Sequence, residues 1–364
     1  MTTPRPLNLY TLPSWSVAAP ILALAGLLLG KPSGIALAIP IGLLLAAAIM
    51  AAVYHAEVLA HYVGEPFGTL LLALAVTIIE ASLIVSIMLG EGAGSQTLAR
   101  DTLMAALMIT INGIIGICLL AGGQRHHEQN YTQAGVSAGL AMLATLSVLV
   151  LVLPNFTTAA SGAFYSPKQL VFVAVISLLV YATFVVAQTI RHKDHFVHHI
   201  EEADDHAHEA PVPRAKAIAA SGMLLVALVA VVLLAKLLSP VIESGVRSVG
   251  APQALVGIII AALVLAPEGF AAYRAARADR VQTSLNLAIG SALAAIGLTI
   301  PAVAGVALVF GLDLELGLSM RSIVLLALTL LVATLTLSGG RTTIVQGIVH
   351  LVIFATYLFT TIVP

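Results

Sequence analysis

The sequence is built from long apolar stretches that contain almost no charged residues. An α-helix needs about 20 such residues to cross the hydrocarbon core of a bilayer. Hydropathy predicts about eleven spans, at 14–30, 34–54, 68–90, 102–123, 133–153, 168–190, 216–237, 253–273, 281–301, 321–337 and 343–363. Only 9 % of the residues are charged, against about 25 % in soluble domains. We therefore expect an all-α polytopic membrane protein that is surrounded by membrane lipid.

Charge and cysteine content exclude other classes. The formal net charge of −1 gives no basic surface for nucleic acid. The single cysteine, Cys118, permits no intrachain disulfide and no cysteine-based metal cluster. The first apolar stretch resembles a signal peptide, but Gly30-Lys31-Pro32-Ser33 is a poor cleavage site, so we expect an uncleaved span.

A polar segment separates the spans into two groups. We predict an extra N-terminal helix in residues 1–33, a five-helix repeat in 34–190, a linker in 191–215 and a second five-helix repeat in 216–364. Because five is odd, the two repeats would enter the membrane in opposite orientations, as in many secondary transporters. The distribution of Lys and Arg favours a cytoplasmic N-terminus and linker, in what we expect to be a bacterial inner membrane.

The linker is rich in acidic residues and histidines. A solvated connection is the simplest interpretation, and a patch that attracts cations or senses pH is the alternative, because histidine titrates near neutrality and carboxylates bind divalent cations. The histidine spacing is also compatible with a transition metal. The regulatory candidates are His195, His198, His199, Glu201, Glu202, Asp204 and Asp205.

Two glutamates, Glu80 and Glu268, fall at the middle of predicted spans. An ionised carboxylate at that depth costs at least about 2.5–3.5 kcal/mol. No Lys or Arg lies at the same depth of these spans, so each carboxyl group has to be protonated, hydrated or bound to a cation. Alternation among these states is what a cation/proton exchanger requires. The structural alternative is a pair of neutral glutamates that hydrogen-bond between helices.

Oxygen-bearing groups near the same depth are candidates for supporting cation ligands or helix contacts. They are Thr77, Asn112, Asn286, Ser291 and the Leu263 carbonyl, which Pro267 leaves without its usual helical donor. Together with Glu80 and Glu268 they would suit Ca²⁺, which takes about 6–8 oxygen ligands. We therefore expect a secondary active transporter that exchanges Ca²⁺ for protons by alternating access. Na⁺ or K⁺ would use the same ligand chemistry, so a Na⁺/H⁺ or K⁺/H⁺ antiporter is the alternative. We expect no cofactor, only transported cations and protons, and the sequence does not determine the oligomeric state.

The motifs around these residues resemble the ChaA-type sodium/calcium–proton antiporters, in the CAX branch of the calcium:cation antiporter superfamily. They are Ile79-Glu80-Ala81-Ser82, Ala266-Pro267-Glu268-Gly269 and Asn286-Leu287-Ala288-Ile289-Gly290-Ser291. The resemblance implies that Glu80 and Glu268 bind the ion. The Gly-Asn pair expected before each glutamate is Val76-Thr77 and Val264-Leu265 here, and Ala294 stands where a glutamine is expected. These departures keep Na⁺ and K⁺ open beside Ca²⁺.

Two other functions remain as alternatives. A passive cation channel would use similar residues without coupling to protons. An intramembrane hydrolase would pair Ser137, in the Gly135–Gly139 G-x-S-x-G match, with His350. That motif normally needs a strand-to-helix turn, whereas it falls here in a small-residue helix. The sequence contains no H-E-x-x-H motif and no P-loop, so neither a metalloprotease nor an ATP-driven pump is supported.

The assignment of the linker to regulation gives a first testable prediction. Deletion of residues 195–209 is expected to shift the pH or Ca²⁺ dependence of transport without abolishing it, because the glutamate site lies elsewhere in the chain. The measurement is cation-driven proton flux in proteoliposomes. Complete loss of flux from a normally inserted protein would instead make the linker part of the transport machinery.

Overall fold

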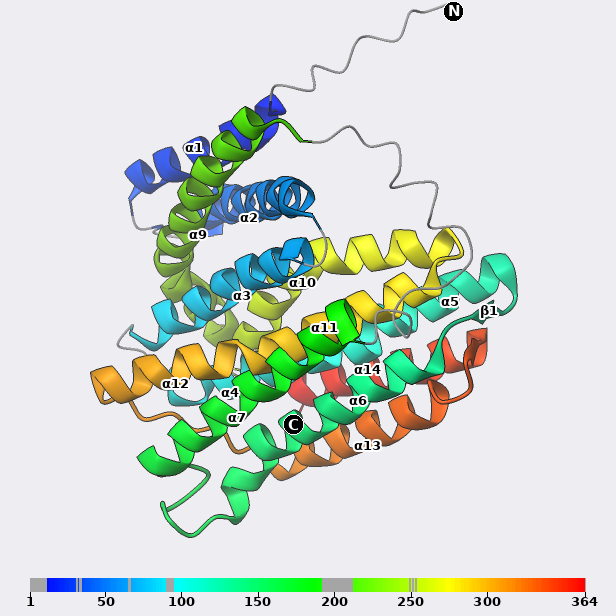
Figure 1. Cartoon of the computed structure of the whole chain (residues 1–364). Helices are drawn as coiled ribbons and strands as arrows, with labels where there is room; N and C mark the ends of the chain where they lie inside the picture. Colours follow the sequence, from blue (N-terminus) through cyan, green and yellow to red (C-terminus); the bar gives the residue numbers. More distant parts are fainter. Residues whose placement is uncertain are drawn as a thin grey trace, which may run out of the picture. The chain divides into compact units, whose positions relative to one another are not determined.

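The computed structural model describes residues 12–30, 32, 35–64, 67–89, 95–191, 212–248, 250, 252 and 254–363. These residues are almost entirely helical (Figure 1). The first part contains α1 (Ser14–Gly26), η1 (Leu27–Leu29), α2 (Ile35–Val63), α3 (Phe67–Met88), α4 (Ser95–Leu107), η2 (Met108–Ile114), α5 (Ile115–His126), β1 (Gln129–Asn130), α6 (Gln133–Ser147), η3 (Val148–Val152), η4 (Leu153–Phe156), α7 (Pro167–Val186) and η5 (Ala187–Arg191). The second part contains α9 (Arg214–Ser248), α10 (Ala254–Arg277), α11 (Val281–Gly297), α12 (Thr299–Phe310), α13 (Met320–Thr336), β2 (Arg341–Thr342) and α14 (Ile344–Ile362).

The helices confirm the prediction of an all-α membrane protein. Within the described residues, eight helical stretches are long and apolar enough to cross a membrane, and three shorter apolar helices accompany them at Ser14–Leu29, Leu74–Ser86 and Met320–Thr336. The count of eleven spans and the boundaries of the two repeats stay predictions. The linker candidates His195, His198, His199, Glu201, Glu202, Asp204 and Asp205 lie outside the described residues.

The chain divides into two compact units, Met1–Ile79 with Glu202–Val241 and Glu80–Glu201 with Ile242–Pro364. In the first unit, Val58 and Leu59 of α2 pack with Ala217 and Ala220 of α9. The buried His55 bonds through Nε2 to the Ser16 carbonyl at 2.9 Å. Each unit therefore combines helices from both predicted repeats.

The second unit is built around the rod formed by α4, η2 and α5. In the span Gln96–His126, 78 % of the most apolar stretch is buried inside the protein, against 28 % for Pro167–Arg191. The rod is therefore central, and α7 faces outward to a larger extent. The middle of the rod, η2, is a π-helix, in which the N–H of Ile115 bonds to the carbonyl of Thr110 five residues back. Single π turns inside α-helices occur frequently at functional sites.

A short antiparallel sheet joins two connections at one end of this unit (Figure 1). Strand β1 follows α5 and pairs with β2, which precedes α14, in the register Gln129↔Thr342 and Asn130↔Arg341. The Gln129 amide also donates to the Asp279 carboxylate at 2.8 Å and to the Ala276 carbonyl at 3.0 Å. These two hydrogen bonds hold the turn between α10 and α11 at the same end of the unit as the sheet.

Helices α5 and α14 approach one another through small residues. A Cβ added to Gly347 would lie 2.6 Å from the Leu120 nitrogen and 2.9 Å from the Gly116 carbonyl oxygen. A Cβ on Gly116 would in turn meet the Leu351 side chain at 2.9 Å. Small residues allow this kind of close backbone approach between membrane helices.

This contact predicts the effect of adding a single methyl group. Gly347→Ala is expected to destabilise the protein by about 1–3 kcal/mol, because the new Cβ clashes with backbone atoms that cannot rotate away. Gly305→Ala in α12 is the matched control, since nothing lies within 4 Å of its added Cβ. The melting temperature in detergent should fall for the first variant and hold or rise for the second. Equal melting temperatures would contradict the close approach.

Candidate functional site

Glu80 lies in a buried polar contact between α3 and α12. Its side chain is buried, and the Thr299 hydroxyl donates to Oε2 at 3.2 Å. Thr299 is the first residue of α12, and one residue, Leu298, separates it from the end of α11 at Gly297. Pro301 follows two residues later and cannot donate to the Gly297 carbonyl, which weakens the helix at this point. The junction between α11 and α12 therefore presents a hydroxyl to the first glutamate.

Glu268 lies on α10 and accepts a hydrogen bond from the Ser291 hydroxyl of α11. Unlike Glu80 it is partly exposed. Helix α10 continues through Pro267, whose missing N–H leaves the Leu263 carbonyl without its usual helical partner. The second glutamate thus has a hydroxyl donor, and a proline directly before it removes one backbone hydrogen bond from its own helix.

The two carboxyl groups are close enough to interact electrostatically, and Glu268 also interacts with the Tyr181 hydroxyl of α7. Sequence reasoning missed both Tyr181 and Thr299. Among the described residues no group of three or more His, Cys, Asp or Glu is arranged to hold a metal ion. Any cation at this place would therefore combine two carboxylates with neutral oxygens.

Asn112 and Asn286, which the sequence predicts as supporting cation ligands or helix contacts, form hydrogen bonds with other side chains. Asn112 donates from Nδ2 to the Thr329 hydroxyl at 2.8 Å, and its Oδ1 lies 3.0 Å from Nδ1 of His350. Asn286 accepts from the Gln282 amide at 3.0 Å. In this arrangement both amide oxygens serve contacts within the protein.

The remaining sequence candidates are placed as follows. Thr77 is buried on α3, one helical turn before Glu80, and belongs to the first unit. Ser137 is exposed on α6, whereas both ring nitrogens of the buried His350 are engaged, by Asn112 and by Thr336. The described residues thus contain no Ser137–His350 dyad, which argues against the hydrolase alternative.

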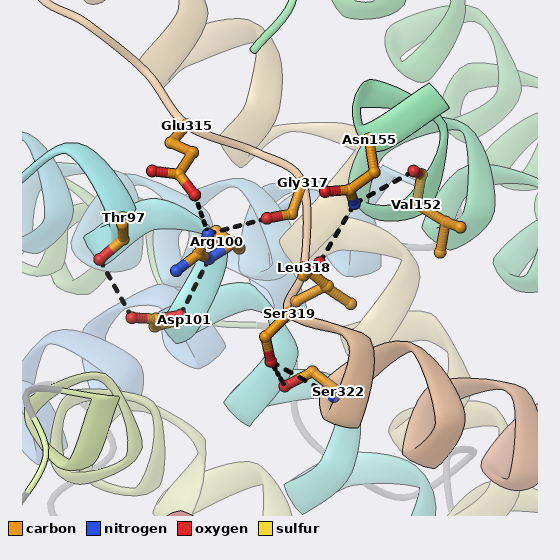
Figure 2. Close-up of polar contacts among 10 residues, drawn as sticks. All are labelled: Thr97, Arg100, Asp101, Val152, Asn155, Glu315, Gly317, Leu318, Ser319 and Ser322. Carbon is orange, nitrogen blue, oxygen red and sulfur yellow. Dashed lines mark hydrogen bonds and ion pairs between the residues drawn. The ribbon is translucent and has the colours of Figure 1, made fainter. Parts of the chain in front are cut away.

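The pair Arg100-Asp101 at the start of the rod fastens the loop between α12 and α13 (Figure 2). Arg100 pairs with Glu315 and donates to the Gly317 carbonyl at 2.8 Å, and its Nε lies 3.1 Å from Asp101. Asn155 donates to the Leu318 carbonyl at 3.1 Å. The loop that ends α12 is thereby held against α4, while the other end of α12 carries the Thr299 contact with Glu80.

A family model for the sodium/calcium exchanger protein matches residues 33–190 and 219–363. The sodium-potassium/proton antiporter ChaA of Escherichia coli is 36 % identical over 352 residues, which cover 95 % of each chain. The Sinorhizobium fredii protein y4hA, named as a candidate ionic transporter, is 48 % identical over 322 residues, covering 88 % of this chain and 87 % of its own. The resemblance to ChaA-type antiporters is thus confirmed.

Solved structures show the same fold. The crystal structure of the H⁺/Ca²⁺ exchanger CAX gives a TM-score of 0.73 at 16 % identity, with 94 % of this chain and 86 % of that chain covered. The structure of native YfkE also gives a TM-score of 0.73 at 16 % identity, with 96 % of this chain and 99 % of that chain covered. At this identity the likeness describes the fold.

The Arg100 cluster makes a prediction about stability. Arg100→Met leaves the carboxylates of Glu315 and Asp101 without their cation. Because the Arg100 and Glu315 side chains are only 14 % and 25 % exposed, the free energy of unfolding should fall by on the order of 3 kcal/mol. Arg341→Met is the matched control, since Arg341 lies 3.9 Å from Glu128 and is 72 % exposed. Its loss should change stability by about 0–1 kcal/mol. Thermal unfolding in detergent compares the two, and equal effects would contradict a fastening role for Arg100.

Proposed function

The chain belongs to the sodium/calcium exchanger protein family, and we propose that it exchanges cations for protons at Glu80 and Glu268. It is a polytopic membrane protein and a cation/proton antiporter of this superfamily. We propose three finer points: which residues exchange the ions, which cation is transported and how transport proceeds.

One observation supports this site above all. Two carboxyl groups lie in apolar helices of the second unit, and each accepts a hydrogen bond from a neutral hydroxyl group, Glu80 from Thr299 and Glu268 from Ser291. A hydroxyl group does not neutralise a carboxylate, so the charge must be balanced by a proton or by a bound cation. Competition between the cation and the proton couples their movements, because each lowers the affinity of the site for the other by the same factor.

The mechanism that we propose is alternating access to this one site. The carboxylates take up a cation on one side of the membrane, release it on the other and return with protons. A monovalent cation neutralises one carboxylate, and a divalent cation neutralises both. The partial exposure of Glu268 and the burial of Glu80 fit a site that is approached by way of Glu268.

We propose Na⁺ or K⁺ as the transported cation, with Ca²⁺ as the second candidate. Ca²⁺ takes about 6–8 oxygen ligands, yet the amide oxygens of Asn112 and Asn286 are engaged by His350 and Gln282. A monovalent ion is neutralised by one carboxylate, so it does not require both glutamates to be ionised at once. The name of ChaA, a sodium-potassium/proton antiporter, supports the same choice, whereas the Ca²⁺/H⁺ antiporter of Aphanothece halophytica, at 24 % identity, supports the second candidate.

A passive cation channel is distinguished by coupling, since an exchanger moves protons in the direction opposite to its cation and a channel does not.

We also propose the bacterial inner membrane as the location, with the N-terminus and the linker in the cytoplasm. Membrane lipid and small inorganic cations are then the protein's partners.

The test of the site uses one variant at each glutamate. Glu80→Gln and Glu268→Gln should each abolish coupled exchange, because a neutral amide keeps an oxygen but cannot exchange a proton. Glu57→Gln, at an exposed position of α2, is the control that should keep exchange. Proton flux is measured in proteoliposomes with Na⁺, K⁺ and Ca²⁺ offered separately.

The expected order is a larger proton flux with Na⁺ or K⁺ than with Ca²⁺. A larger flux with Ca²⁺ would favour the second candidate. Wild-type flux from both glutamine variants would leave Glu80 and Glu268 with a structural role, and cation-dependent current without proton movement would identify a channel.

A further inference from the structure

His350 is a buried histidine in the last apolar helix, α14. Both of its ring nitrogens lie within hydrogen-bond distance of side chains from other elements. Nδ1 is 3.0 Å from Oδ1 of Asn112 in η2, and Nε2 is 2.9 Å from the Thr336 hydroxyl of α13. Three elements of the second unit therefore meet at this one ring.

The hydrogen-bond pattern fixes which atom donates to Asn112. The Nδ2 of Asn112 faces the Thr329 hydroxyl at 2.8 Å and the Met108 sulfur at 3.6 Å, so its Oδ1 is left as the acceptor. The ring of His350 must then carry a hydrogen on Nδ1, since an amide oxygen cannot donate. Asn112 is held from α13 and from α14 at the same time.

Asn112 belongs to the π-helical segment η2, which reaches the glutamate helix on its other side. A Cβ added to Gly269, the residue after Glu268, would lie 3.1 Å from Cδ1 of Ile114, the last residue of η2. The segment thus packs between the His350 contact and the α10 turn that carries Glu268. A shift of η2 would change the space beside that carboxyl group.

We propose that His350 is a positioning residue for ion exchange, which holds Asn112 and, through it, the η2 turn that packs beside Glu268. The proposal rests on the proposed function of Glu268. Its chemistry is a neutral hydrogen bond, and the histidine takes no part in carrying the ion. The geometry makes cation affinity, rather than folding alone, the property that depends on this bond.

The experiment compares two substitutions of His350 in purified protein reconstituted into liposomes. His350→Ala removes the donor and should raise the half-saturating cation concentration about tenfold, the loss expected for one buried hydrogen bond, with a smaller change in maximal flux. His350→Gln keeps one donor and one acceptor and should restore the half-saturating concentration to within about twofold of wild type. A substitution to Gln that behaves like Ala would overturn the proposal.

Two further variants separate positioning from folding. His55→Ala removes an equally buried histidine that bonds to Ser16 in the first unit, and it should leave the half-saturating concentration unchanged. Thr329→Val keeps the size of the side chain, removes the second bond to Asn112 and should shift the cation dependence in the same direction as His350→Ala. A lower melting temperature of His350→Ala with a wild-type cation dependence would reduce the histidine to a structural role and overturn the proposal.

Glu268→Gln, measured in parallel, distinguishes failure of this inference from failure of the proposed function. If Glu268→Gln is inactive and His350→Ala has wild-type cation affinity, only the positioning role fails. If Glu268→Gln exchanges normally, the site itself is misassigned, and the positioning role fails with it.

Discussion

A carboxyl group enclosed by apolar helices cannot keep its charge without a partner, and this constraint organises the second unit of the protein. Glu80 and Glu268 come from helices far apart in the chain, yet their carboxyl groups interact. The hydroxyl groups of Thr299 and Ser291 stabilise a carboxylate by hydrogen bonding, but they bring no positive charge. An ionised carboxylate here would still need a positive charge to balance it, and this need is the physical basis of the exchange that we propose.

The sequence singles out the two glutamates because a single acidic residue stands out in an otherwise apolar stretch, and their role in ion exchange stays a prediction. The same contrast locates the helices, since a span is defined by its own composition. Thr299 and Tyr181 give no comparable signal, because hydroxyl side chains occur at many positions in these helices. Pro301, two residues after Thr299, is a local feature that disfavours a continuous helix at this point.

Hydrogen bonds between residues far apart in the chain could not be predicted from the local sequence pattern. Asn112 was expected near the glutamates because it lies at a similar depth, but its amide is held by Thr329 and by His350, 238 residues later in the chain. Arg100-Asp101 and Asp279-Arg280 are similar dipeptides, each near the start of a helix, but they make different contacts. Arg100 fastens the loop after α12, whereas Asp279 accepts a hydrogen bond from Gln129 in β1. Such assignments depend on which helices pack together.

The π-helical turn in the central rod changes which faces α4 and α5 present to their neighbours. Each N–H in such a turn bonds one residue further back than in an α-helix, so the turn absorbs one extra residue. A helical wheel drawn at about 100° per residue across Ser95–His126 therefore assigns one half of the rod to the wrong face. The extra residue rotates the side-chain pattern of α5 relative to that of α4, so the two helices pack against their neighbours through different faces. Removal of one residue from Met108–Ile114 would leave the flanking helices long enough to span, yet it would rotate the Asn112 amide away from the partners that hold it.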